Sequence, residues 1–378
     1  MDTMTSRPSL LILTFSPIRS DPRVLKQVEL LKDKYRVSTC AYGEAPDGVD
    51  EHFALPADSR GWPSDKVGLL TRNYKRVYNN LSAVSHARNV LPTGHFDIVV
   101  ANDLNTLPLA LELKPTLGVH SDLHEYAPSE KESDPKWRLF VAPYMKWMCR
   151  KFLPEAQSVT TVSQGIADEY RSQFGVQVGV VTNAAPYLEA EPTPTAAPLK
   201  VIYSGAGQRY RKIELILEAM RGVGTDVQMD FVVMPNEPDY VMELRSMAAT
   251  LPNVRFLEPV PYEELVSLLR NYDVAMCFLP NSTFNLQNAL PNKFFEAVQA
   301  RIGVITGPSP AMVSLVEIYG LGAVTNDFSA ESLRTALTNL NERDTAAWKS
   351  AANDAAWALS AESQVALWDS AIAKIAAS

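Results

Sequence analysis

The sequence predicts an α/β protein with two domains, each a doubly wound parallel sheet. Short apolar runs, typical of strands buried on both faces, alternate with segments of helical periodicity. This alternation stops at residues 189–198, which are rich in proline and alanine, and then starts again. We therefore expect a first domain over residues 1–190, a second over 199–358 and a terminal helix over 359–378.

The composition narrows the classes of function. The chain has 378 residues, is 46% hydrophobic and 21% charged, and has a net charge of −8, which gives it no overall attraction to nucleic acid. Cys40, Cys149 and Cys277 lie far apart among apolar neighbours, as buried thiols of a reducing compartment do, so we expect a cytoplasmic protein. There is no clustered Cys/His pattern and no D-x-D pair, so no metal site is expected.

The first half begins with a buried strand and a helix whose start is well marked. Asp21 and Pro22 form an N-cap and a first-turn proline, and an apolar stripe follows them. The loop between, residues 16–23, lacks G-x-G-x-x-G, which argues against a nicotinamide enzyme. The strands predicted in this half are residues 10–15, 37–41, 98–101, 119–123, 159–162 and 178–182.

Polar residues follow several of these strands, where open parallel sheets gather their ligands. This placement alone selects Asp103, His124, Glu125 and Ser163. Asp103 is interpreted either as an acceptor contact or as a helix cap, and Ser163 as a cap. His124 either donates to a sugar or phosphate or is a structural histidine paired with Glu125 or Asp122.

Two basic segments leave their role open. Residues 60–88 carry six basic residues and one acid beside an apolar stripe, and are either a solvated helical face or a surface for an acceptor or an anionic membrane. Residues 136–152 carry an aromatic stripe beside three basic residues. This stripe either packs into the core or contacts a membrane surface. Peripheral contact with the inner face of a membrane is therefore one expectation, although no run is suited to cross a bilayer.

The second half repeats the first in kind. Its predicted strands are residues 201–203, 229–234, 254–257, 274–279 and 304–306. Its predicted helices are residues 213–220, 241–250, 262–271 and 292–300, with further helices from Ser329 on.

The stretch 281–303 is the strongest candidate for a binding site. A polar loop rich in amides, without a charged residue, leads into the helix predicted at 292–300. A helix N-terminus binds anions with its unpaired N–H groups, and amides both donate to and accept from sugar hydroxyls. We therefore predict that this stretch holds a nucleotide-sugar, with the backbone of Ala289 and Leu290, and Lys293, near the diphosphate and Glu296 within reach.

The run PNKFFEAVQARIGVITGPSPAMVSLVEIYGLG resembles the donor signature of retaining GT-B glycosyltransferases of family four. SDPRVLKQVELL, FDIVVANDLNTLPLAL, SDLHEYAPSE, TTVSQGIADEY and VTNAAP resemble the same family in order and spacing. The resemblance implies a GT-B fold, with two Rossmann-like domains facing across a cleft and a last helix that returns to the first. It also implies metal-independent, retaining transfer from a nucleoside-diphosphate sugar to an acceptor hydroxyl, without a cofactor.

In the donor half, Glu296 matches the family's second glutamate, which accepts from the ribose hydroxyls, and Asn288 stands where the first glutamate faces the donor sugar. An amide still binds hydroxyls but stabilises positive charge less well than a carboxylate. In the basic loop after residue 203, Arg211 stands at the family's lysine position and Arg209 is the candidate to replace its arginine, which falls on Ala206. Both are predicted to contact the diphosphate, with a solvent-exposed basic turn as the alternative. Gly205 and Lys212, the latter at the family's glycine position, are further substrate-binding candidates.

In the first half, His124 matches the family's histidine near the reacting sugar, while Ser16 and Arg19 stand in a loop where relatives carry paired glycines. The catalytic candidates are thus His124, Arg211 and Glu296. Asn288 and the missing glycines keep a non-catalytic sugar-nucleotide-binding partner subunit open. A sugar-nucleotide epimerase or a phosphorylase is a further alternative.

Overall fold

The computed structural model describes residues 7–376 and divides the chain into two compact units. The first unit holds the residues up to Val181 and those from Val365 on, and the second is Thr182–Gln364. We expected the boundary within 190–199 instead. The proline-rich segment lies in the second unit because hydrogen bonds hold it there; Lys349 Nζ, for example, donates to Thr193 Oγ1 over 2.9 Å.

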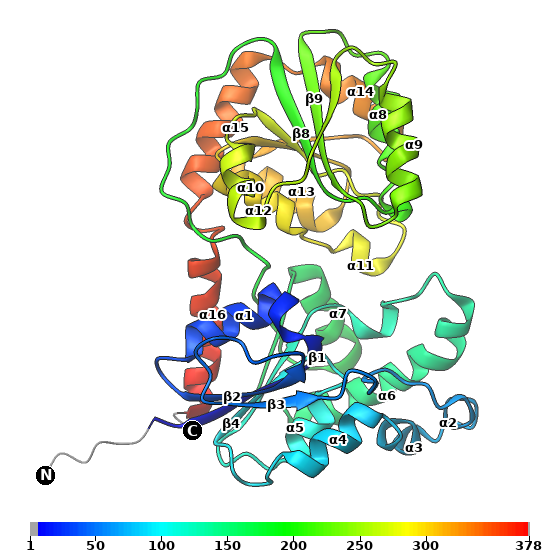
Figure 1. Ribbon diagram of the computed structural model, residues 1–378, viewed down its shortest axis with the longest axis vertical. Helices are drawn as coiled ribbons and strands as arrows, with labels where there is room; N and C mark the ends of the chain where they lie inside the picture. The colour runs from blue at the N-terminus through cyan, green and yellow to red at the C-terminus, as the bar shows by residue number, and fades with distance from the viewer. Residues whose placement is uncertain (1–6, 377–378) are drawn as a thin grey trace, which may run out of the picture. The chain divides into compact units, whose positions relative to one another are not determined.

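The first unit is built on a seven-stranded, fully parallel sheet in the order β3-β2-β1-β4-β5-β6-β7 (Figure 1). The edge strand β3 escaped prediction because its sequence EHFAL is only partly apolar and only Leu55 is buried. The strands are β1 (Ser9–Pro17), β2 (Arg36–Tyr42), β3 (Glu51–Leu55), β4 (Ile98–Asn102), β5 (Gly118–Leu123), β6 (Ser158–Thr161) and β7 (Gly179–Val180).

Helices α1 and α16 cover one face of this sheet. Leu10 and Ile12 of β1 pack with Val24 and Val28 of α1 and with Ile372 of α16, since alternate strand residues share a face. The helices of the unit are α1 (Pro22–Leu31), α2 (Lys66–Leu70), α3 (Tyr74–Asn79), α4 (Ser82–Val90), α5 (Leu107–Glu112), α6 (Ala142–Phe152), α7 (Gln164–Phe174) and α16 (Ala361–Ala376), the last from Val365 on.

The basic segments fold differently from the simple helices expected of them. Residues 60–88 form α2, α3 and α4 in place of one helical face. A π-helical turn, Trp137–Val141, leads into α6, where Pro143 lies in the first turn. Trp137 and Tyr144 are buried, which confirms the core interpretation for these two aromatic residues.

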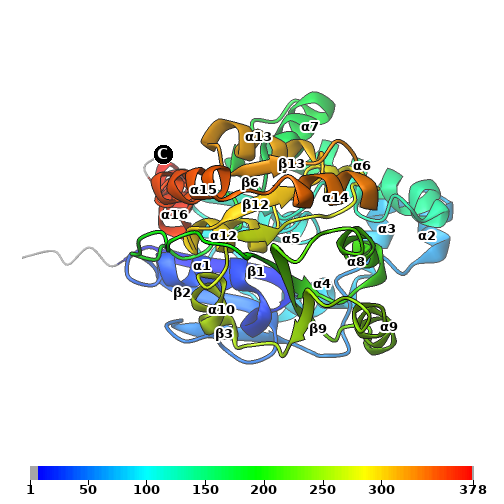
Figure 2. The ribbon, with the colours of Figure 1, turned by 90° about the horizontal axis from the view of Figure 1, so that it is seen from above.

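The second unit has a six-stranded parallel sheet in the order β10-β9-β8-β11-β12-β13. Its helices α8, α9 and α14 cover one face, and α10, α12, α13 and α15 the other (Figures 1 and 2). The strands are β8 (Leu199–Ala206), β9 (Val227–Met234), β10 (Val254–Leu257), β11 (Val274–Met276), β12 (Gly303–Thr306) and β13 (Gly322–Val324). The helices are α8 (Glu214–Met220), α9 (Pro238–Ala248), α10 (Tyr262–Leu269), α11 (Phe284–Gln287), α12 (Asn292–Gln299), α13 (Pro310–Tyr319), α14 (Ala330–Thr338) and α15 (Glu342–Ala355).

Both sheets therefore have the doubly wound α/β order that the sequence predicted, and each reverses its strand order once. The reversal lies between β1 and β4 in the first unit and between β8 and β11 in the second. Ligands of such sheets bind beyond the carboxyl ends of the strands at this point. Across residues 7–376, no helix has the length and apolar character needed to cross a bilayer.

Candidate functional site

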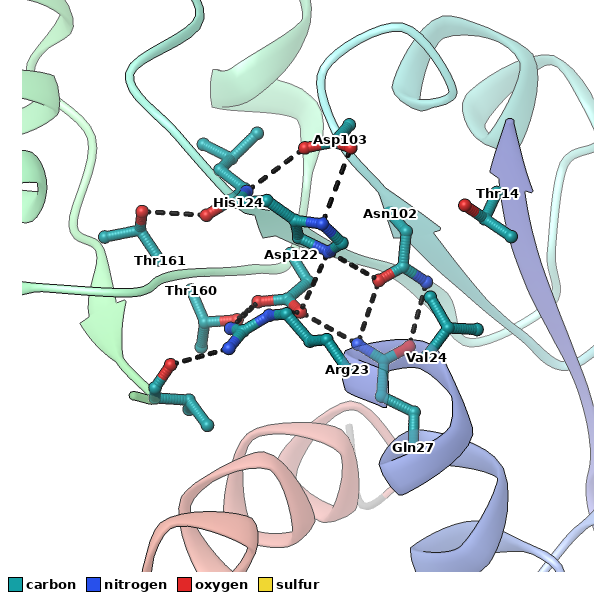
Figure 3. Close-up of polar contacts among 12 residues, drawn as sticks. Thr14, Arg23, Val24, Gln27, Asn102, Asp103, Asp122, His124, Thr160 and Thr161 are labelled. Carbon is teal, nitrogen blue, oxygen red and sulfur yellow. Dashed lines mark hydrogen bonds and ion pairs between the residues drawn. The ribbon is translucent and has the colours of Figure 1, made fainter. Parts of the chain in front are cut away.

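His124 lies just after β5, at the carboxyl edge of the first sheet, and polar groups hold it on three sides (Figure 3). Its Nε2 lies 3.2 Å from Asn102 Oδ1 and 3.7 Å from Asp122 Oδ2. Its backbone N–H donates to Asp103 Oδ1 over 3.1 Å, and its Nδ1 lies 3.6 Å from the other oxygen of that carboxylate. With 21% of its side chain exposed, the imidazole is positioned by these partners and still open to a ligand.

The group beneath His124 is a buried ion pair. Arg23 donates to both oxygens of Asp122 over 2.7 Å each, and Gln27 Nε2 bridges Asp122 and Asn102. Desolvation raises the pKa of the Asp122 carboxyl, but the charge and hydrogen bonds of Arg23 outweigh it and bring the pKa to about 2. Asp122 is thus a fixed negative charge below His124. Its remaining donor, Thr160 Oγ1, lies 2.6 Å away.

The structure resolves the roles left open for the caps. Asp21 does cap α1, accepting from the N–H groups of Arg23 and Val24. The cap interpretation of Asp103 is wrong, because α5 has Thr106 as its N-cap and the Asp103 carboxylate turns to His124 instead. Ser163 does occupy the N-cap position of α7, but its hydroxyl makes no capping bond.

A pocket of about 280 Å³ opens beside His124, and the first unit alone forms it. Ser16 lines it and donates to Asp21 over 2.7 Å. Arg19 is directed elsewhere: its guanidinium donates to the carbonyl of Ala45 after β2 and lies along a different hollow. The remaining lining residues are Trp62, Asp103, Leu104, Asn105, Leu123, Glu125, Ala127, Glu130 and Met145.

In the second unit, the end of β8 meets the N-terminus of α12. Gly205 has φ +147°, and a Cβ placed there would lie 3.2 Å from Lys293 Nζ, so glycine admits this close approach. Lys293 Nζ lies 3.6 Å from the centre of the Tyr203 ring. The candidates Gly205 and Lys293 are far apart in the sequence, and the fold brings them together where the strand order of the second sheet reverses.

The loop after β8 and the N-terminus of α12 carry cationic side chains that are partly shielded from water. Desolvation, with the charge of Arg211 adding to it, lowers the pKa of Lys293 to about 7. The Arg211 guanidinium also acts on the Tyr203 hydroxyl, so Tyr203 lies between the two cations. A bound diphosphate would favour the charged form of Lys293, which desolvation and the nearby guanidinium of Arg211 disfavour in the free protein.

The other two basic residues of the loop lie differently. Arg209 pairs with Glu243 of α9 at 2.5 Å and stacks over Tyr240. Lys212 has φ +54° at the end of the short turn Arg209–Arg211, a conformation that suits glycine. This left-handed backbone is consistent with the glycine that the family resemblance implied at this position.

The loop before α12 contains a short helix, α11, where the sequence predicted irregular backbone. Asn288 is buried, and its side-chain amide donates to the carbonyl of Phe284 over 3.0 Å. The N–H of Ala289 donates to Leu286 at 3.4 Å, a long hydrogen bond. Among the described residues the N–H of Leu290 has no protein acceptor, so it is the backbone donor of this loop best able to bind an anion.

Glu296 lies on the buried side of α12, with 4% of its surface exposed. Desolvation, and after it the charge of Glu296, raises the pKa of Tyr262, and the same charge partly opposes the lowering of the pKa of Lys293. The carboxylate is therefore electrostatically coupled to the cation at the helix N-terminus. No set of three or more His, Cys, Asp or Glu side chains within residues 7–376 is arranged to hold a metal ion.

The sequence named Asp122 as a possible partner of His124, and the two side chains do lie 3.7 Å apart, but it did not reveal Asn102, Gln27 or Arg23. Arg23 and Asp122 stand 99 positions apart, and the two partners of Gln27 lie 75 and 95 positions away in sequence, so no local pattern connects them. The one available signal was the position of Asp122 inside an apolar strand, because a buried carboxylate requires a partner of opposite charge or a hydrogen-bond donor. Asn105 and Glu130 of the pocket lie in loops and carried no signal.

Comparison with known proteins agrees with this architecture. Residues 28–185 match the model of Glycosyltransferase Family 4. The chain's fold is similar to that of HepE from Anabaena, solved in complex with UDP, at a TM-score of 0.70 and 15% identity over 97% of this chain and 100% of that one. Sucrose-phosphate synthase from Thermosynechococcus elongatus gives a TM-score of 0.71 at 12% identity over 98% and 100% of the two chains.

A third similar structure is the α,α-trehalose 6-phosphate synthase of Burkholderia multivorans, with a TM-score of 0.65 and 11% identity over 98% of this chain and 97% of that one. No curated protein matches the sequence. At identities this low the structural likeness shows a shared fold.

Proposed function

We propose that this chain, which shares its fold with GT-B proteins and matches Glycosyltransferase Family 4 over residues 28–185, is a glycosyltransferase. It transfers a sugar from a nucleoside-diphosphate sugar to an acceptor hydroxyl, with retention of configuration at the anomeric carbon and without a metal ion. The observation that carries this proposal is the meeting of Gly205, Arg211 and Lys293 at the reversal point of the second sheet.

The proposed reaction breaks the bond between the anomeric carbon and the diphosphate oxygen, and forms one between the anomeric carbon and the acceptor oxygen. The acceptor proton passes to the departing diphosphate. Negative charge grows on that diphosphate in the transition state, so cations already placed there accelerate the step. Arg211, Lys293 and the N–H of Leu290 take this role, and Glu296 accepts from the ribose hydroxyls.

His124 is proposed to donate to the sugar being transferred. His124→Ala is expected to lower the turnover of UDP-glucose, the donor with which HepE was solved, by about 10²-fold while the melting temperature stays near that of the parent. Product release from the nucleotide sugar, with and without acceptor, measures this. His86→Ala on α4 is the matched control, and full turnover by His124→Ala would remove the residue from the site.

Binding of the donor is expected to take up a proton. A free Lys293 with a pKa of about 7 is largely neutral at about pH 8, whereas a bound diphosphate favours its charged form. Affinity for UDP-glucose should therefore fall as the pH rises above 7. Calorimetry in buffers of different ionisation enthalpy counts the protons, and Lys293→Arg, which stays charged, should bind without uptake. Equal uptake by the variant would assign the proton to another group.

Chelation is expected to leave turnover unchanged, since Arg211 and Lys293 supply the positive charge that a divalent ion would otherwise bring. Turnover of the same donor before and after dialysis against EDTA measures this. A loss restored by Mg²⁺ or Mn²⁺ would contradict the metal-independent part of the proposal.

We also propose that the first unit contacts an anionic membrane through the segments 60–88 and 136–152. A hollow of about 500 Å³ between α3 and α6 contains five basic residues and no acid. Beside it, Leu70 and Leu139 are 68% and 66% exposed. Exposed apolar side chains rimmed by cations are typical of a surface that binds anionic lipid. The five cations are Arg72, Arg138, Lys146, Arg150 and Lys151.

Flotation with phosphatidylcholine vesicles, with and without phosphatidylglycerol, tests this contact. Binding is expected only with the anionic lipid and should weaken in salt. Combined Lys146→Glu and Arg150→Glu should abolish it, whereas Lys114→Glu, just after the end of α5 and outside both segments, should not. Binding that is the same with neutral and anionic vesicles, and the same in the double variant, would contradict the proposal.

A further inference from the structure

The pocket beside His124 is unusual in its charge. Asp21, Asp103, Glu125 and Glu130 line it, and no lysine or arginine does. Lys131, which acts on Glu125 and Glu130, lies over the rings of Trp62 and Trp137, at 5.4 and 5.7 Å. The acids crowd one another: desolvation, with Asp103 as a contributing charge, raises the pKa of Glu125 to about 7 and that of Glu130 to about 8.

A second observation, independent of these acids, indicates a ligand. Asn105 also lines the pocket, is only 7% exposed, and its Oδ1 has no hydrogen-bond partner among the described residues. An unpaired amide oxygen that is buried costs free energy until a donor reaches it. The pocket is therefore richer in acceptors than in donors: the side-chain donors that line it are the His124 and Trp62 rings, the Asn105 amide and the Ser16 hydroxyl, which already donates to Asp21.

The wall of the pocket suits a sugar ring. Trp62 is 41% exposed there and is held edge-on against Trp137, at 5.8 Å between ring centres. A fixed indole face stacks on the C–H face of a pyranose, and carboxylates accept from the groups at the ring's edge. A volume of about 280 Å³ takes one such ring.

We infer that this pocket binds the acceptor as a sugar bearing a protonated amino group, with its ammonium held by Asp103, Glu130 and the Oδ1 of Asn105. The inference rests on the proposed function and names the chemical class of its acceptor. With a neutral sugar Glu130 keeps its proton at neutral pH, whereas an ammonium donates three hydrogen bonds and favours the carboxylate form.

Binding without nucleotide tests this separately from catalysis. Methyl glucosaminide, methyl glucoside and methyl N-acetylglucosaminide are titrated into the full chain and followed by saturation-transfer NMR. The ammonium sugar is expected to bind about tenfold more tightly than the two neutral sugars, because its hydrogen bonds to carboxylates are charge-assisted. Equal affinity for the three, or no binding of the ammonium sugar, would overturn the inference.

Two isosteric variants, Asp103→Asn and Glu130→Gln, should each remove most of that preference, whereas Glu155→Gln, an exposed acid outside the pocket, should keep it. Asparagine also tolerates the left-handed backbone of residue 103, where φ is +65°. A preference that survives in both pocket variants would place the amine elsewhere. UDP-glucose binding, measured in parallel, reports on the second unit, so that its loss would indicate failure of the proposed function and not of the acceptor class.

Discussion

Arg211→Ala is expected to lower kcat/KM for the sugar nucleotide by about 10²–10³-fold, the usual effect of removing one donor that meets charge developing in a transition state. The guanidinium is close enough to Lys293 to lower the pKa of that lysine, and it acts on Tyr203 between them. Because the charge on the leaving diphosphate grows during the reaction, most of the loss should fall on kcat.

Steady-state kinetics of Arg211→Ala and Arg245→Ala distinguishes the loss of a donor at the diphosphate from the loss of any positive charge on the second unit. Arg245 pairs with Glu258 at the surface of the same unit, and its loss should change turnover little. Arg209→Ala is expected to lose less than Arg211→Ala, because Glu243 already holds its guanidinium. If Arg211→Ala kept the kcat of the parent, the diphosphate would have to bind elsewhere.

Arg23→Ala is expected to lower the free energy of unfolding of the first unit by about 3–5 kcal/mol, since it leaves the buried Asp122 carboxylate without its counter-charge. The guanidinium is itself buried, donates a further bond to the carbonyl of Val181 and stacks on Trp368 at 4.6 Å. Its loss therefore also weakens the attachment of α16. Denaturant unfolding, followed by the tryptophan signal, measures the change.

The dependence of the free energy of unfolding on pH, measured below pH 4, gives an independent check on the same ion pair. A carboxyl whose pKa falls from 3.8 to about 2 on folding contributes stability above pH 4 and loses it as the pH falls toward 2, a change of about 2 kcal/mol. Arg23→Ala should lose this pH dependence, and Arg171→Ala, which breaks an exposed pair with Asp168, should keep it. An unchanged unfolding free energy in Arg23→Ala would contradict the role given to the ion pair.

Local patterns predicted much of the fold because the strands are buried on both faces. Residues 98–101 and 119–123 became β4 and β5 almost unchanged, and the helix expected at 292–300 is α12. The strand expected at 274–279 ends at Met276, although its apolar tail stays buried as irregular chain.

The sequence predicted those site residues whose place in the fold follows from their position at the end of a strand. Strand-end placement found His124 and Asp103, since the carboxyl ends of parallel strands meet at one edge. The support of His124 by Asn102, and through it by Gln27, depends on side chains from distant segments, which periodicity does not report. The same holds for Gly205 and Lys293, whose closeness follows from the reversal of strand order.

The most direct measurement is the crystal structure of the chain with UDP-glucose bound. The diphosphate should lie at the N-terminus of α12, against Arg211 and Lys293, with the ribose hydroxyls on the Glu296 carboxylate. A nucleotide bound outside the second unit, or one whose ribose leaves Glu296 untouched, would contradict the function proposed here.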